Sequence, residues 1–458
     1  DGDRPMTRAA NPLRPAPGAP RPYAFPDFQR HQLDNGLTVW LVPLPGRGLV
    51  NVHLLVDAGA AAETEEQAGV AALTAQLLVT GTRRLDAAAF AAATERLGIE
   101  VSSESSWDSA RAAFQSLPEH TDEGLGLLSE MVREPRFDPD EFERLKAERL
   151  ADILQARADP GRIADETFLR QLYAPGVPYG RVSAGSPESV GGLTVDQVRA
   201  FHATQWGAGS SHLIIAGGFD PDVALRAAET HLGRWSGRGP GHRSIEVRPA
   251  GGRRVVIVDR PGSVQSELRV GQIGIQRGHA DFFPAVVMAA LLGGVFGSRL
   301  NMRLREELGY TYGASASFDP RRSPGPVIAR AGVQTEVTAP AIRELLGQID
   351  RIRDEPASAE ELAEVRAFMI GVFPLRFEST GGVAAAIEPL AVYGLPDDYW
   401  QTYRSRIEVV SPDDVQRVAR QLLDPDRFLI LLSGDAATVR EAVEAEGLGP
   451  LEVVTGPS

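Results

Sequence analysis

An internal repeat constrains the fold of this chain more than any other feature of its sequence. Residues 193–198, Leu-Thr-Val-Asp-Gln-Val, precede an expected helix and then an apolar run that ends at Gly217. Residues 410–415, Val-Ser-Pro-Asp-Asp-Val, precede the same arrangement, and its apolar run ends at Gly434. The offset is 217 residues both between positions 193 and 410 and between the two glycines, so no gap intervenes. This match predicts a duplicated chain whose two halves share one plan.

A second match lies near the start of each half. Residues 39–42, Val-Trp-Leu-Val, and 51–56, Asn-Val-His-Leu-Leu-Val, match residues 255–258, Val-Val-Ile-Val, and 267–270, Glu-Leu-Arg-Val. Each pair of runs predicts two adjacent strands.

Between these strands both halves are mainly helical. Asp138 followed by Pro139 is a cap with a first-position proline, and it predicts a helix through about Gln155. Ser358 with Glu361 is a capping box that opens another helix. Strands first, helices next and strands last predict an α+β fold of two homologous halves, each a mixed or antiparallel sheet covered by helices.

The length of 458 residues exceeds the roughly 250–300 residues that one hydrophobic core usually serves, so two domains are expected. Residues 236–241, Ser-Gly-Arg-Gly-Pro-Gly, have linker composition and place the boundary near residues 236–252. We therefore predict an N-terminal α+β domain over 25–240 and a C-terminal α+β domain over 241–458. Residues 1–24 are rich in Pro and Arg and predict a flexible leader.

Composition excludes several classes of partner. A net charge of −14 argues against nucleic acid as a partner. The chain lacks the roughly 20-residue apolar run of a transmembrane segment and contains no cysteine. Residues 1–24 hold no apolar signal core, so either an export signal has been removed or the chain has been shortened. We expect a periplasmic location, otherwise a cytoplasmic one.

Residues 69–82, Gly-Val-Ala-Ala-Leu-Thr-Ala-Gln-Leu-Leu-Val-Thr-Gly-Thr, resemble a known active-site helix. In the pitrilysin/insulinase family of inverted zinc peptidases the corresponding segment is G-x-A-H-x-x-E-H-x-x-x-x-G-T, where two His bind zinc and the Glu activates water. Here Ala72, Ala75 and Gln76 occupy those three positions. Alanine offers no donor atom, and a neutral amide oxygen is a poor substitute for imidazole at zinc. This helix is therefore predicted to hold no catalytic zinc.

The family's remaining zinc ligand is a Glu on a later helix, and the resemblance places Asp152 at that position. Asp152 is a single carboxylate without the other ligands, and read alone it is a solvated helix charge. The eight histidines are scattered, with no two at helical ligand spacing, and His53 and His202 are expected to be structural or exposed. We expect no metal or other cofactor in this chain, although a site assembled from distant residues stays open.

The segment 291–312 is the strongest positive match. It resembles the family pattern G-G-x-x-x-S-R-L-x-x-x-L-R-E-x-x-G-x-x-Y, starting at Gly293 and Gly294. The resemblance implies that Arg305 and Tyr312 reach across a chamber and hold substrate near zinc. An Arg can donate several hydrogen bonds to peptide carbonyls, and a Tyr hydroxyl can stabilise an oxyanion. Read without the family, Arg305 is a helix cation and Tyr312 a strand aromatic. The two glycines permit a tight turn or close packing, or form a loop that contacts substrate.

The resemblance extends over about residues 28–451 and implies the pitrilysin-like metallopeptidase fold. Relatives of this length commonly form two-subunit clams, in which the zinc helix of one subunit faces the Arg/Tyr segment of the other. The chain is therefore expected to be a non-catalytic, substrate-binding or regulatory subunit of a heterodimeric zinc endopeptidase that acts on peptides or unfolded proteins. Its partner would be a homologous catalytic subunit that carries H-x-x-E-H and the zinc.

Two alternatives remain at this point. The chain could be a structural subunit without proteolysis, similar to the core proteins of respiratory complexes that share this fold. It could also be an independent peptidase with an unrecognised metal site.

Overall fold

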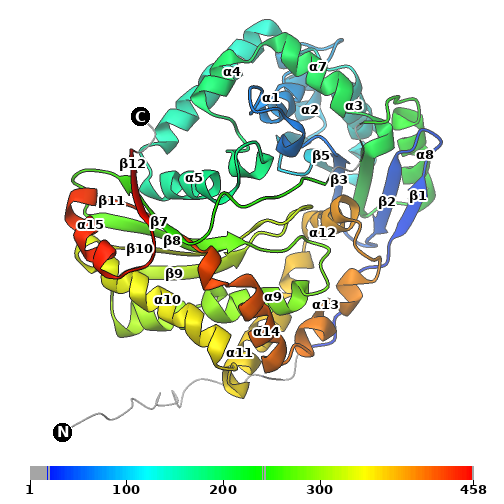
Figure 1. The fold of residues 1–458 in the computed structure, drawn as a ribbon. Helices are drawn as coiled ribbons and strands as arrows, with labels where there is room; N and C mark the ends of the chain where they lie inside the picture. Colours follow the sequence, from blue (N-terminus) through cyan, green and yellow to red (C-terminus); the bar gives the residue numbers. More distant parts are fainter. Residues whose placement is uncertain (1–17, 19–20, 240, 242–243, 456–458) are drawn as a thin grey trace.

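The computed structural model describes residues 18, 21–239, 241 and 244–455. Within these residues the chain forms two six-stranded sheets, one from each half (Figure 1). The first sheet has the order β1 (Gln29–Gln32), β2 (Thr38–Pro43), β6 (Ser211–Gly217), β3 (Val50–Val56), β5 (Ala110–Ser116) and β4 (Glu100–Ser105). The second has the order β12 (Leu451–Thr455), β7 (Arg254–Asp259), β11 (Leu429–Gly434), β8 (Gln265–Ile273), β10 (Pro326–Gln334) and β9 (Thr311–Phe318).

The two sheets share one topology, which confirms the predicted α+β fold of two homologous halves. In the first, β2 and β6 are parallel, while the pairs β6–β3, β3–β5 and β5–β4 are antiparallel. In the second, β7, β11, β8, β10 and β9 repeat this pattern. The sheets differ at one edge strand: β1 is antiparallel to β2 in the first sheet, whereas β12 is parallel to β7 in the second.

The prediction that the early strands of each half are adjacent is wrong. Strand β6 lies between β2 and β3, and β11 lies between β7 and β8. Both inserted strands come from the end of their half, and almost all of their residues are buried. A strand that is apolar along its whole length is most stable in the middle of a sheet, where it is paired on both edges and covered on both faces.

Helices cover both faces of these sheets. The first half contains α1 (Val70–Leu78), α2 (Ala87–Arg96), α3 (Thr121–Arg133), α4 (Pro139–Ala156), α5 (Pro160–Leu172), α6 (Pro187–Gly192), α7 (Val195–Gln205) and α8 (Pro221–Leu232). The second contains α9 (Phe282–Ala289), two π-helical segments η5 (Ala290–Gly294) and η6 (Asn301–Glu307), α10 (Thr338–Asp354), α11 (Ala359–Val372), α12 (Thr380–Tyr393), α13 (Tyr399–Glu408), α14 (Pro412–Leu422) and α15 (Ala436–Ala445). No helix in the described ranges is long and apolar enough to cross a membrane.

The predicted helix starts are confirmed. Asp138 caps α4 with Pro139 in its first turn, and Ser358 forms a reciprocal capping box with Glu361 at the start of α11. The predicted leader lies largely outside the described residues, as do positions 240, 242 and 243 of the predicted linker.

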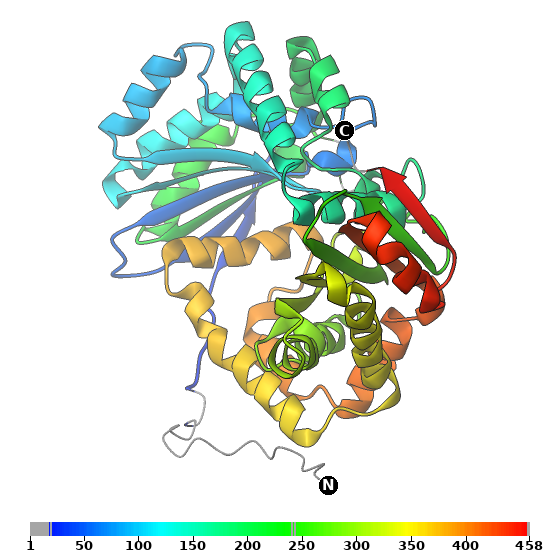
Figure 2. The same cartoon turned by 90° about the vertical axis from the view of Figure 1, so that its left-hand side faces the viewer.

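Each half contributes a helix to the sheet of the other half (Figure 2). Helix α5 of the first half packs on β8 and β11, where Phe168 shares a buried cluster with Val256 and Leu431. Helix α12 of the second half packs on β3 and β6, where Ile387 joins a cluster that contains Ile214. The exchange covers a second apolar face of each sheet and joins the halves through buried surface.

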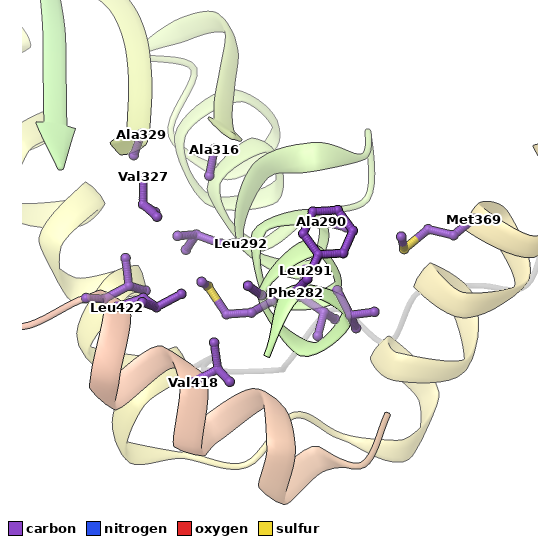
Figure 3. Packing of buried hydrophobic residues seen from close by; sticks show 14 of the residues in the cluster. Phe282, Ala290, Leu291, Leu292, Ala316, Val327, Ala329, Met369, Val418 and Leu422 are labelled. Carbon is purple, nitrogen blue, oxygen red and sulfur yellow. The ribbon is translucent and has the colours of Figure 1, made fainter. Parts of the chain in front are cut away.

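The π-helical segment η5 is anchored in the core of the second half. Figure 3 shows Leu291 and Leu292 pointing into a cluster of buried side chains. Their neighbours come from the sheet and from α14: Ala316, Val327, Ala329, Val418 and Leu422. This packing fixes the start of the segment that carries Arg305.

Candidate functional site

The helix that resembles the zinc helix begins at a well-organised N-terminus. Gly69 precedes α1 with φ of 98°, a left-handed conformation that favours glycine, and a Cβ there would lie 2.9 Å from the carbonyl oxygen of Ala184. The carboxylate of Glu63 accepts hydrogen bonds from the backbone N–H groups of Gly69 (3.1 Å) and Ala71 (2.8 Å). Burial raises the pKa of Glu63 to about 7, although these bonds and Arg181 lower it.

The altered ligand positions do not fit zinc. On α1, Ala75 is fully buried, Ala72 is nearly so and Gln76 is half-buried, while Asp152 is exposed on the neighbouring helix α4. Together they offer one neutral amide and one carboxylate, whereas a catalytic zinc site uses three protein ligands drawn from His, Cys and carboxylates. Among the described residues, no three His, Asp or Glu side chains are grouped so that they could hold a metal ion.

Two of the histidines have structural contacts. His53 Nδ1 lies 2.7 Å from Glu388 Oε1 on α12. His202 Nε2 lies 2.9 Å from the carbonyl oxygen of Val132, and its ring stacks on Trp206. Neither contact brings a second metal-ligating imidazole nearby.

The Arg/Tyr segment is fixed in place by residues other than Arg305 and Tyr312. Arg299 forms a two-bond ion pair with Glu361 of α11, with Nε–Oε1 and Nη2–Oε2 distances of 2.9 and 3.1 Å. Arg303 Nε donates to Glu344 of α10 at 2.8 Å, and this bond is the largest cause of the raised pKa of Arg303. Leu304 is fully buried. These contacts hold η6 against two helices of the second half.

Arg305 and Tyr312 themselves face solvent. The side chain of Arg305 is 43% exposed. Among the described residues its one ion pair is with the adjacent Glu306 at 3.3 Å, and its guanidinium lies 5.1 Å from the ring centre of Phe296. Tyr312 is 91% exposed on β9, and its hydroxyl has no hydrogen-bond partner among the described residues. Because η6 packs against β9, the two side chains come from contacting elements.

Sequence reasoning missed a cavity of about 580 Å³ beside Asp152. It lies between the end of α4, helix α5, the loop before α1 and the segment 173–189. Arg149, Arg162 and Arg170 are among its lining residues, whereas Ala72, Ala75 and Gln76 are not. One sequence pattern could have indicated this cavity: Arg162, Glu166 and Arg170 are spaced four residues apart, so their charges lie on one face of a helix.

Comparisons with known proteins agree with this architecture. Residues 39–176 match the family model described as insulinase (peptidase family M16), and residues 192–369 match that of the peptidase M16 inactive domain. A crystal structure of a peptidase M16 inactive domain from Pseudomonas fluorescens is 25% identical, with a TM-score of 0.83 over 89% of this chain and 98% of that one. The structure of a protease from Helicobacter pylori has the same fold, with 18% identity and a TM-score of 0.83 over 90% of this chain and 100% of that one.

Curated relatives point to the same family. A non-peptidase homolog from Helicobacter pylori is 24% identical over 80% of this chain and 84% of its own length. An uncharacterized zinc protease of Mycobacterium tuberculosis is 25% identical over 86% of this chain and 90% of its own length. With the zinc-ligand positions altered and both family regions present, the chain belongs to peptidase family M16, the insulinase or pitrilysin-like family, as a non-catalytic member.

Proposed function

We propose that this chain is the substrate-binding subunit of a heterodimeric zinc endopeptidase that cleaves peptides or unfolded proteins. A homologous M16 subunit with an intact H-x-x-E-H helix would supply the zinc, the base and the attacking water. One observation carries the proposal: on a segment whose other charged side chains anchor it, Arg305 and Tyr312 are left exposed. Exposed polar groups on a rigid support suit a binding surface.

The chemistry of the two side chains supports this role. A guanidinium presents several donors in one plane, and Arg305 keeps most of them free while Phe296 limits its movement. It can therefore hold the carbonyl groups of an extended peptide. The Tyr312 hydroxyl can donate to the oxyanion that forms when water attacks a peptide carbonyl. Neither group can generate the nucleophile, which is why a partner with zinc is required.

The test is reconstitution of the complex. The candidate partner is an M16 protein with H-x-x-E-H encoded by a neighbouring gene, and cleavage of an unfolded protein is measured for each chain and for the mixture. We expect chelator-sensitive cleavage to depend on both chains. Tyr312→Phe should lower kcat about 100-fold, the typical loss for an oxyanion donor. Arg305→Ala should weaken substrate binding and raise KM. Neither substitution should prevent complex formation.

Matched controls separate this role from a general effect of mutation. Tyr310→Phe removes a hydroxyl from the same segment, and Arg440→Ala removes an exposed arginine that pairs with Glu444 on α15. Both should leave turnover unchanged. If Arg305→Ala and Tyr312→Phe behave like these controls, the proposed role is wrong.

Other outcomes would favour the alternatives. Stoichiometric zinc and chelator-sensitive cleavage in the isolated chain would indicate an independent peptidase. Copurification with membrane electron-transfer proteins, and with no peptidase, would indicate a structural subunit.

A further inference from the structure

The cavity beside Asp152 contains three arginines whose guanidinium groups make no hydrogen bond with a described residue. Arg149 projects from α4, and Arg162 and Arg170 come from α5. None of the three guanidinium groups has a hydrogen bond or ion pair with a described residue. The Nε of Arg149 is buried from solvent and finds no acceptor. A buried N–H of a charged group without an acceptor is costly, and an anion in the cavity would satisfy it.

Two other charged groups on the wall, Arg181 and Glu63, are engaged in hydrogen bonds with the backbone. Arg181 donates to the carbonyl oxygens of Thr64 (2.6 Å), Ala60 and Glu63 (3.2 Å each), so it braces the loop before α1. The carboxylate of Glu63 accepts the backbone bonds at the start of α1. These residues shape the cavity and leave Arg149, Arg162 and Arg170 as the free donors.

The acidic side chains limit the charge of the ligand. Five arginines and five carboxylates line the cavity, so it has no excess positive charge that would favour a polyanion: Arg149, Arg157, Arg162, Arg170, Arg181, Glu63, Glu65, Asp152, Glu166 and Glu188. Glu65, Asp152 and Glu188 are exposed, as are Arg162 and Arg170, whereas Arg149 is half-buried. Burial raises the pKa of Glu166, although Arg170, Arg162 and Arg157 lower it, and this weakens its competition for their charge.

Apolar residues also line the wall, beside the polar Thr64, Ser186 and Ser189, and they suit a carbon chain. Ile153, Val177, Pro178 and Val182 line the cavity together with these charges. A volume of about 580 Å³ lies within the range of roughly 300–1,000 Å³ that is usual for small-ligand sites. A single anionic group joined to an apolar body fits this lining better than an inorganic anion does.

We propose that the cavity binds the C-terminal end of a peptide chain, with Arg149, Arg162 and Arg170 holding its terminal carboxylate. The choice of a peptide rests on the proposed function, whereas the carboxylate is inferred from the buried Arg149 Nε without an acceptor and from the guanidinium groups that make no hydrogen bond with a described residue. A guanidinium can donate two parallel hydrogen bonds to a carboxylate, and the apolar wall would contact the last side chains of the peptide. The cavity would then select chain ends, such as the products of an earlier cleavage.

The experiment measures binding of one probe in two forms by titration calorimetry with the full chain. The probe is the tetrapeptide acetyl-Ala-Ala-Val-Leu with a free C-terminal carboxylate, and its comparison is the same tetrapeptide with a C-terminal amide. We expect the carboxylate form to bind at least about tenfold more tightly, the usual scale for a hydrogen bond to a charge. Arg149→Gln should remove most of this difference, and Arg149→Lys should retain part of it.

Three results would overturn the proposal. The first is equal affinity for the carboxylate and amide forms of the peptide. The second is an Arg149→Gln variant that is folded by circular dichroism and still prefers the carboxylate form as strongly as wild type does. The third is tighter binding of inorganic phosphate than of the peptide. Arg305→Ala should leave this discrimination unchanged, because Arg305 does not line the cavity. If Arg149→Gln loses the preference for the carboxylate peptide while the complex cleaves normally, the result would support peptide-end binding in the cavity without bearing on the proposed function. If Arg305→Ala still prefers the carboxylate peptide and also leaves cleavage by the complex unchanged, the result would count against the proposed function but not against the cavity.

Discussion

His53 Nδ1 and Glu388 Oε1 lie 2.7 Å apart, although they are separated by 335 residues and belong to different halves of the chain. Arg111 also contacts Glu388, at 3.1 Å, so two basic side chains on neighbouring strands hold one carboxylate of α12. The second sheet repeats the arrangement, with Arg269 (2.7 Å) and Arg330 (3.1 Å) both bonded to Asp165 of α5. Each exchanged helix is thus held by an ionic contact as well as by apolar packing.

Removal of this contact should weaken the joint between the halves. Glu388→Ala leaves His53 and Arg111 without their shared acceptor in a largely buried position. Because the Glu388 side chain is still 24% exposed, we expect a loss of about 2 kcal/mol in the free energy of unfolding, below the value for a fully buried pair. Denaturant unfolding measures it. The control Glu378→Ala removes an exposed carboxylate just before α12 and should change stability by less than about 0.5 kcal/mol.

The contribution of Glu388 also has a pH dependence with a definite sign. Burial raises its pKa, but the contacts with His53 and Arg111 outweigh burial, and the net shift is downward. Its stabilising effect is therefore present above the ordinary pKa of Glu and is lost as the pH falls through the lower folded value. A difference between wild type and Glu388→Ala that does not shrink in acid would contradict this assignment.

The sequence supplied the repeat and the local signals, but not the pairing between halves. Caps such as Ser358 act within one turn of a helix, and the 217-residue offset reports two copies of one topology, so both are readable in a single sequence. Asp165 and Glu388 look like ordinary helix charges, because helical spacing shows which residues share a face and not which sheet that face will meet. The arginine-lined cavity was hidden for the same reason, since its walls meet only in the folded chain.

His202 should make the protein less stable in mildly acidic solution. Burial lowers the pKa of His202 to about 4, although its bond to Val132 opposes the shift. The unfolded chain therefore binds a proton that the folded chain does not, between about pH 6.5 and 4. Above about pH 6.5 this histidine does not lower the free energy of unfolding. As the pH drops from about 6.5 to 4, the free energy of unfolding falls by at most about 3 kcal/mol because the unfolded chain takes up the proton.

The measurement is the free energy of unfolding as a function of pH, for wild type and for His202→Gln. The variant should lose this part of the pH dependence. His120→Gln, which changes a histidine at the turn before α3, should keep it. Parallel curves for wild type and His202→Gln would show that the imidazole does not contribute.

Reintroducing the family's catalytic Glu should destabilise this chain. Ala75 is fully buried on α1, so Ala75→Glu would bury a carboxylate in the packed interior of the first half. We expect the free energy of unfolding to fall by about 2 kcal/mol or more, as measured by denaturant unfolding. Ala88→Glu makes the same change at an exposed position of α2 and should alter stability by less than about 0.5 kcal/mol. An Ala75→Glu variant as stable as Ala88→Glu would show that this position of α1 still accommodates a glutamate side chain.

Gly293 should be the critical glycine of the Arg/Tyr segment. A Cβ at this position would lie 2.1 Å from the backbone nitrogen of Ala316, so Gly293→Ala must push η5 away from β9, the strand that carries Tyr312. At Gly294 the nearest atoms to an added Cβ are 3.4 Å away, so Gly294→Ala is a matched control one residue along the chain.

We expect Gly293→Ala to lower the free energy of unfolding by about 3 kcal/mol, because backbone atoms cannot move aside as a flexible side chain can. Gly294→Ala should change it by less than about 1 kcal/mol. Thermal and denaturant unfolding measure both variants, and cleavage by the reconstituted complex should fall with Gly293→Ala even at temperatures where the variant is folded, because the support of Tyr312 has shifted. Equal effects of the two substitutions would show that contact with β9 does not determine the position of η5.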